Sequence, residues 1–378
     1  MDNSKHQGDF FEEYHNEDTA LVVNDGVEQP PVVNPYIKNF FKNKRKSILT
    51  VDEYMDGITK GDTVILSKAI TLIESSLPEH RAMAREIITR CQELSSANQS
   101  MRIGITGVPG AGKSTFIESF GNLVTAKGHK LAVLAIDPSS EKSKGSILGD
   151  KTRMETLCNN PDAFIRPSPS AGSLGGVARK TRETVLLCET AGYDVVFIET
   201  VGVGQSETAV HSMSDFFLLL MLSGAGDDLQ GIKRGIMEMS DLIAITKADG
   251  NNVDKANMAR ALYANALHLF PPTESTWVPT ALTSSSLEKK GLEEIWAKIE
   301  EYFDLVKGNG YYQKRRREQA RFWMYESINE SLKEMFYENP AIEKILPQYE
   351  DCVLDGKMDS FAAAGELLER YVERDIRN

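Results

Sequence analysis

The chain has 378 residues, of which 41% are hydrophobic and 26% charged, as in an ordinary globular protein with one large domain plus extensions or two modest domains. Its net charge of −12 argues against a nucleic-acid partner held by bulk electrostatics. The four cysteines lie far apart without a Cys-x-x-Cys motif, which argues against a disulfide framework and a structural zinc site.

The N-terminal segment, residues 1–34, carries eight acidic residues against a single lysine, and we expect an acidic, flexible tail. It has no positively charged start followed by an apolar core, so no secretory signal is predicted. The longest apolar run, Phe216 to Leu222, is seven residues long, whereas a membrane helix needs about twenty. The expectation is a cytoplasmic protein with no membrane partner.

Residues 35–98 are predicted to form an N-terminal helical region. Apolar residues between Val64 and Ile73 recur at helical spacing, and Pro78 begins a second helical stretch that runs to Leu94.

The region 99–305 alternates short apolar strands with helical stretches. The predicted strands are 101–106, 131–136, 195–200, 216–222, 241–246 and 277–282. Near-continuous apolar strands separated by helices indicate an α/β fold with a mostly parallel sheet flanked by helices. Ligands of such sheets bind at the carboxyl ends of the strands.

Residues 306–378 are helical and charged in pattern. The basic run 314–317 is expected to be a solvated helix face. The aromatic cluster 322–325 beside it can pack either against the preceding domain or against a second subunit.

One motif identifies a phosphate-binding loop. The stretch 107–114 fits G-x-x-x-x-G-K-[ST], between a predicted strand and a predicted helix. Its backbone N–H groups and the helix N-terminus would surround phosphate, while Lys113 adds a cation and Ser114 a magnesium ligand. The predicted nucleotide contacts here are Gly107, Val108, Pro109, Gly110, Ala111, Gly112, Lys113, Ser114 and Thr115.

Acidic residues follow two of the predicted strands. Asp137 and Glu199 stand at strand ends, and Asp150 lies in the long small-residue segment after Asp137. Mg²⁺ prefers oxygen ligands, so these three acids and Ser114 are the predicted metal groups. Lys113, Asp137 and Glu199 are predicted to be catalytic.

Gly202 occupies the position of the glycine in the D-x-x-G motif of common GTPases, where it contacts the γ-phosphate. The next residue is Val203 rather than a glutamine that orients water. Because an apolar side chain cannot orient water, we expect slow hydrolysis without a partner.

Base recognition is assigned to Thr246-Lys247-Ala248-Asp249. The Asp249 carboxylate accepts hydrogen bonds only, which suits guanine and not adenine, and Lys247 would lie along the base. Thr246 replaces the usual asparagine, which puts one tether to the phosphate-binding loop in doubt. Ser285, Ser286 and Leu287 are a second predicted base contact.

These motifs, in this order, make the chain resemble the MeaB/ArgK family, GTPases that chaperone adenosylcobalamin-dependent methylmalonyl-CoA mutase. The most diagnostic block is residues 223–233, and the resemblance covers about residues 60–330. Thr246 and Ser286, where alanine is usual, depart from the pattern.

The resemblance implies a P-loop GTPase of the SIMIBI class with N- and C-terminal helical extensions. It implies GTP or GDP as ligand, Mg²⁺ as cofactor and no tightly held cobalamin. It also implies a homodimer held partly by a C-terminal arm, 306–378, and mobile segments at 137–151, 199–205 and 222–233. Lys233 is the side chain expected to reach the nucleotide when the mutase binds.

Two alternatives stay open at this point. A metallochaperone GTPase of the nickel-insertion type shares the domain class, but the usual His-rich or Cys/His site near the loop is absent from the sequence. A P-loop small-molecule kinase would use Asp137 as a base, but Asp249 as a guanine reader counts against it.

Overall fold

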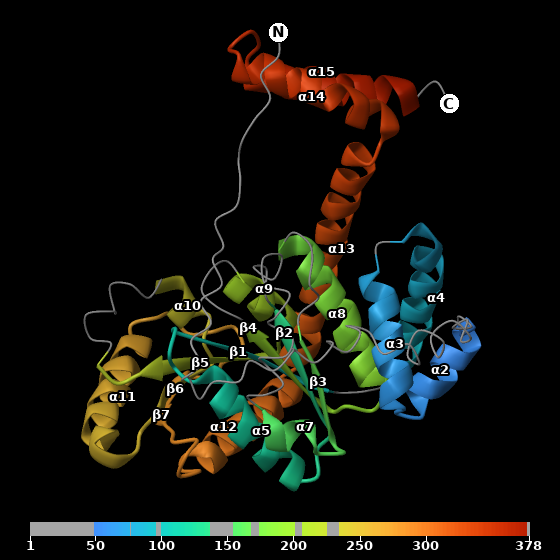
Figure 1. Ribbon diagram of the computed structural model, residues 1–378. Coiled ribbons are helices and arrows are strands. Elements are labelled where there is room, and N and C mark those ends of the chain that lie inside the picture. Colours follow the sequence, from blue (N-terminus) through green and yellow to red (C-terminus); the bar gives the residue numbers. More distant parts are fainter. Residues whose placement is uncertain are drawn as a thin grey trace, which may run out of the picture. The chain divides into compact units, whose positions relative to one another are not determined.

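Seven parallel strands form one sheet, in the order β3-β2-β4-β1-β5-β6-β7, with helices on both of its faces (Figure 1). The computed structural model describes residues 49–75, 77–95, 100–136, 154–167, 174–200, 206–224 and 234–375. The strands are β1 (Met101–Gly107), β2 (Leu131–Ile136), β3 (Ala163–Arg166), β4 (Val195–Thr200), β5 (Phe216–Leu222), β6 (Leu242–Thr246) and β7 (Thr280–Thr283). The predicted α/β class is confirmed.

Two strands differ from the prediction by more than one residue. β7 begins at Thr280 rather than at residue 277, because Pro279 has no N–H for the ladder and the Trp277 N–H donates to Ser275 Oγ at 3.2 Å. β3 was not predicted. It is a four-residue edge strand with one fully buried position, Phe164, so it lacks a long apolar run.

The two faces of the sheet carry separate hydrophobic clusters, because successive side chains of a strand point to opposite faces. On β5, Leu218 and Leu220 pack in the cluster that also contains Phe120 of α5 and Trp296 of α12. Leu219 and its neighbour Met221 pack instead with side chains of α10 and α11. The helices around the sheet are α5 (Lys113–Ala126), α7 (Glu155–Cys158), α8 (Leu174–Thr190), α9 (Ser206–Met213), α10 (Arg234–Glu238), η3 (Gly250–Asn252), α11 (Val253–Leu267) and α12 (Leu292–Gly308).

Three helices precede the sheet: α2 (Val51–Thr59), α3 (Thr63–Glu74) and α4 (Pro78–Ser95). Helix α2, which lies within the predicted helical region 35–98, begins at a capping box in which Thr50 and Glu53 satisfy each other's backbone N–H groups. The three helices contact one another and α8.

Three helices follow the sheet: α13 (Tyr311–Tyr337), α14 (Pro340–Leu354) and α15 (Ser360–Asp375). None of the helices in the described part of the chain combines the length and the apolar character that a membrane span requires.

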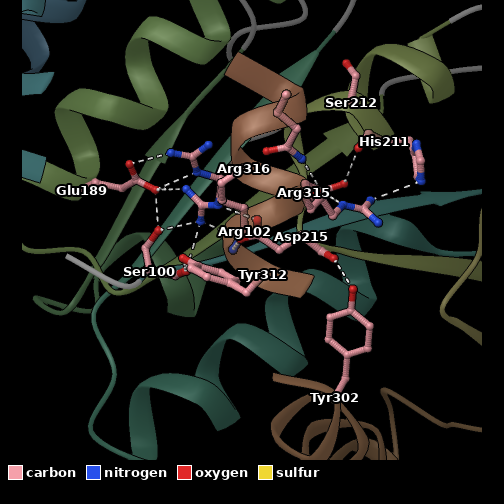
Figure 2. A network of polar contacts seen from close by, with 12 residues as sticks. Ser100, Arg102, Glu189, His211, Ser212, Asp215, Tyr302, Tyr312, Arg315 and Arg316 are labelled. Atoms are coloured by element: carbon pink, nitrogen blue, oxygen red, sulfur yellow. Dashed lines mark hydrogen bonds and ion pairs between the residues drawn. The ribbon is translucent and has the colours of Figure 1, made fainter. Parts of the chain in front are cut away.

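The prediction that the basic run is a solvated helix face is wrong for Arg315 and Arg316 (Figure 2). Arg316 pairs with Asp215 through Nε and Nη2, each at 2.6 Å. Arg315 donates to the Ser214 carbonyl at 3.1 Å and to His211 Nε2. Burial and the Arg315 charge lower the pKa of His211 to about 3, so its ring is neutral and can accept this bond. These contacts attach α13 to the end of α9 and to the two residues between α9 and β5.

Candidate nucleotide-binding site

The phosphate-binding loop connects β1 to α5. Gly110 and Gly112 have φ angles of 79° and 78°, in the left-handed region that favours glycine. Gly107 ends β1 so close to β5 that a Cβ there would lie 2.5 Å from the Leu220 carbonyl oxygen. The loop conformation therefore requires the glycines that the motif contains. Lys113, Ser114 and Thr115 form the first turn of α5.

Lys113 is held against the loop, since its Nζ donates to the Gly107 carbonyl at 3.0 Å. Burial lowers the pKa of this lysine, whereas the carboxylates of Glu199 and Glu207 raise it. Glu207, in the first turn of α9, was not among the predicted site residues, and no motif on the sequence distinguishes it. Two carboxylates thus favour the charged form of the ammonium group that is predicted to contact phosphate.

Glu199 is buried near the end of β4, opposite Ile105 of β1. Beside it, the hydroxyls of Thr106 and Thr200 are hydrogen-bonded at 2.9 Å and join the two strand ends. The Ser114 hydroxyl, at the start of α5, makes no hydrogen bond to the described residues. The other predicted phosphate and metal residues, Asp137, Asp150, Gly202 and Lys233, lie outside the described residues.

Thr246, which replaces the usual asparagine, ends β6. Its hydroxyl donates to the Ala111 carbonyl of the phosphate-binding loop at 2.8 Å and lies 3.0 Å from the Met221 carbonyl of β5. The tether that the sequence left in doubt is therefore present, with a hydroxyl in place of the amide.

The carboxylate of Asp249, the predicted guanine contact, is positioned by the loop after β7. Ser285 Oγ donates to Asp249 Oδ2 at 2.6 Å. Ser285 is buried and pairs with Lys290 across an isolated antiparallel bridge. Ser285 therefore holds the carboxylate through its side chain, a role that the sequence did not assign.

Lys247 adopts a left-handed backbone conformation with φ of 55°, which is rare for a residue with a side chain and clusters at functional sites. Its carbonyl accepts from Asn252 Nδ2 at 2.6 Å, and Ser223 Oγ in turn donates to Asn252 Oδ1 at 2.6 Å. A Cβ on Gly112 would lie 3.9 Å from Lys247 Cε, so the lysine stem passes beside the phosphate-binding loop. Sequence reasoning missed Ser223 and Asn252.

The remaining two predicted base contacts differ in their surroundings. The Ser286 carbonyl accepts from Ser119 Oγ of α5 at 3.1 Å, which joins the loop after β7 to the helix that follows the phosphate-binding loop. Leu287 is exposed. The structure thus brings together the loops after β1, β6 and β7 at one edge of the sheet, as a nucleotide site requires.

Comparison with known proteins agrees with this geometry. Residues 66–341 match the family described as "Methylmalonyl Co-A mutase-associated GTPase MeaB". The chain belongs to the MeaB family. It is accordingly a P-loop GTPase that binds GTP and GDP and hydrolyses GTP.

Three relatives illustrate the extent of the match. GTPase ArgK of Escherichia coli is 44% identical over 299 residues, which cover 79% of this chain and 90% of ArgK. The Mus musculus protein named "Methylmalonic aciduria type A homolog, mitochondrial" is 41% identical over 363 residues, 94% of this chain and 88% of the mouse protein. A crystal structure described as LAO/AO transport system kinase has a TM-score of 0.66 and 36% identity, covering 86% of this chain and 99% of that one.

Proposed function

We propose that this MeaB-family GTPase uses GTP binding and hydrolysis to gate cofactor loading or protection of an adenosylcobalamin-dependent acyl-CoA mutase, with methylmalonyl-CoA mutase as the first candidate. The observation that carries the proposal is the match of residues 66–341 to mutase-associated GTPases. The mouse relative, named after methylmalonic aciduria, supports it, because the similarity extends over 94% of this chain.

In the proposed nucleotide complex, the backbone N–H groups of residues 107–115 other than Pro109, which has none, surround the phosphates. Lys113 exchanges the Gly107 carbonyl for phosphate oxygens. Asp249, held by Ser285, accepts the hydrogen bonds of guanine. These contacts bind and orient the nucleotide, and they give the site its preference for GTP over ATP.

The donor set suits Mg²⁺. Ser114 offers a hydroxyl oxygen that has no hydrogen bond to the described residues. Glu199 offers a buried carboxylate, which lies near enough to Lys113 to raise the pKa of that lysine. Hard oxygen donors of this kind are what Mg²⁺ prefers. We assign Ser114, Glu199, Asp137 and Asp150 as metal groups, and the ion would neutralise charge on the phosphates.

Hydrolysis is proposed to be slow without the partner, because Val203 cannot orient water. When the mutase binds segment 222–233, Lys233 is proposed to reach the nucleotide and to stabilise the charge that develops on the phosphates during hydrolysis. Gly202 is assigned the γ-phosphate contact.

The arm at 306–378 is proposed to hold a homodimer. Five large apolar side chains of α13 are about half exposed and recur three or four positions apart, which places them on one helix face: Phe322, Tyr325, Ile328, Leu332 and Met335. An exposed apolar stripe of this kind marks an interaction surface.

The test is capture of the mutase encoded in the same genome, with the nucleotide state controlled. Immobilised protein is loaded with GDP or with a non-hydrolysable GTP analogue and mixed with purified mutase. Nucleotide-dependent capture, reduced in Lys113→Ala, is the expected result. No capture in any nucleotide state would reject the mutase as partner while leaving the GTPase assignment intact.

A further inference from the structure

A cavity of about 860 Å³ lies between α4, α8, the start of β1 and α13. Its walls include Arg102, Glu189, Tyr312 and Arg316, which Figure 2 shows on these elements. The volume is that of a site for a small organic molecule. Arg102 is the second residue of β1 and Gly107 the last, so the cavity and the phosphate-binding loop lie toward opposite ends of this strand.

Five arginines and two glutamates line this space, which we call the arginine cavity. Three of the arginines are paired with acids. Arg102 binds Glu189 through Nε at 2.7 Å and Nη2 at 2.8 Å. Arg316 binds Asp215, and Arg179 binds Glu183 at 3.2 Å.

The two other arginines, Arg182 and Arg317, make no hydrogen bond or ion pair with any residue that the structure describes. Arg317 is exposed, and Arg182 is half-buried with its guanidinium 5.2 Å from the ring centre of Trp323. The cavity therefore contains two positive charges that form no ion pair within the described part of the chain.

The surroundings of Arg182 show that its charge is poorly compensated. Burial and the charges of Arg102 and Arg316 lower its pKa to about 10, against the opposing effect of Glu183 and Glu189. The guanidinium is still charged at neutral pH. An anion in the cavity would stabilise the Arg182 charge against the loss of solvent and against repulsion from Arg102 and Arg316. It would also accept charge-assisted hydrogen bonds from the guanidinium groups.

We infer that the arginine cavity binds a small organic phosphate, whose phosphate contacts Arg182 and Arg317 and whose apolar part packs on Ile88 and Leu186. A phosphate is favoured over a carboxylate for two reasons. Its charge near −2 matches two arginines without acids, and its oxygens match the guanidinium fork. The ligand would bridge α8 and α13, and the inference does not depend on the mutase proposal.

The experiment uses the full chain saturated with GDP and Mg²⁺, so that the phosphate-binding loop is filled. Phenyl phosphate is the probe, and its affinity is measured by titration calorimetry. Arg182→Gln and Arg317→Gln are compared with the control Arg90→Gln, which removes an exposed arginine of α4 that is paired with Asp52 and Glu86. Thermal melting checks the fold of each variant.

The inference predicts that phenyl phosphate binds the wild type, that each cavity variant weakens binding about tenfold or more, and that Arg90→Gln changes little. Because Arg317 is exposed, its variant stays informative if Arg182→Gln folds poorly. Absence of binding to the wild type, or equal affinity in wild type and Arg317→Gln, would overturn the inference. Benzoate binding as tightly as phenyl phosphate would overturn the choice of phosphate.

Discussion

The hydroxyl of Thr246, at the end of β6, donates to the carbonyl oxygen of Ala111 in the phosphate-binding loop at 2.8 Å. The two residues are 135 positions apart in the chain. This bond joins the segment predicted to contact guanine to the phosphate-binding loop, so the predicted base and phosphate contacts form one unit. A threonine hydroxyl thus forms the tether that the motif Asn-Lys-x-Asp assigns to an asparagine amide.

We predict that Thr246→Val weakens both stability and nucleotide binding. Valine keeps the shape of threonine but leaves the buried Ala111 carbonyl without its donor, which costs about 1–3 kcal/mol. Denaturant unfolding and GTP titration measure the two effects. Thr246→Ser is the control, since it keeps the hydroxyl. Wild-type affinity and stability in Thr246→Val would show that the bond is dispensable.

Lys113→Ala is expected to remove tight triphosphate binding while leaving the fold intact. Lys113 lies outside both hydrophobic clusters, and within the described part of the chain its Nζ hydrogen-bonds to the Gly107 carbonyl. Loss of charged hydrogen bonds to phosphate corresponds to a fall in affinity of about tenfold to hundredfold. Calorimetry with GTP measures it, and Lys127→Ala, an exposed lysine at the end of α5, is the matched control. Unchanged GTP affinity in Lys113→Ala would refute the phosphate-binding role.

Asp249→Asn is expected to relax the preference for guanine by about 1–3 kcal/mol, because an amide replaces a carboxylate that only accepts. The same amide can donate to a base that carries an oxygen in place of the exocyclic amine, so xanthosine triphosphate should gain affinity. Competition among GTP, ATP and xanthosine triphosphate measures the change. Ser285→Ala should have a smaller effect in the same direction, since it removes only the hydrogen bond to Asp249 Oδ2. Equal binding of ATP and GTP by the wild type would contradict the assignment.

The ion-pair network around Glu189 makes stability depend on pH in acid. Burial alone would raise the pKa of this carboxyl, but Arg102, Arg316 and the Ser100 hydroxyl outweigh burial and lower it from 4.5 to about 2. Since the folded-state pKa is below the unfolded one, the stabilisation is complete above pH 4.5 and is lost as the pH falls toward 2. This lowering of the Glu189 pKa corresponds to about 3 kcal/mol in the free energy of unfolding.

Urea unfolding of wild type and Glu189→Gln between pH 6 and 3 tests this dependence. The wild type should be more stable at pH 6, and the difference should shrink as the pH falls. A difference that stays constant over this range would show that the Glu189 carboxyl does not carry the pH dependence.

The strands and the phosphate-binding loop could be predicted because their signals are local. The run Phe216–Leu222 is apolar throughout and forms β5 over the same residues. The glycines 107, 110 and 112 occupy positions where the backbone excludes or disfavours a side chain. The positive φ angles of Gly110 and Gly112 are local constraints, whereas Gly107 is constrained by Leu220 of β5 and could be recognised only as part of the motif.

Other features depend on residues far away in the chain, and the sequence does not show which distant residues meet. Arg316 is half-buried because Asp215, 101 positions earlier, accepts hydrogen bonds from its Nε and Nη2, whereas its neighbours Lys314 and Arg317 are exposed. For the same reason the sequence does not predict the contacts of Glu207, Asn252 and the Ser223 hydroxyl. Each is an ordinary polar residue until the fold places it beside Lys113 or Lys247.

The central claim is that this GTPase serves an adenosylcobalamin-dependent mutase. The most direct measurement is the rate of GTP hydrolysis with and without the purified methylmalonyl-CoA mutase of the same organism, for wild type and Lys233→Ala. The account predicts a slow basal rate in both proteins, a rate raised about tenfold or more by the mutase in the wild type, and loss of that stimulation in the variant. A wild-type rate that the mutase leaves unchanged would contradict the claim.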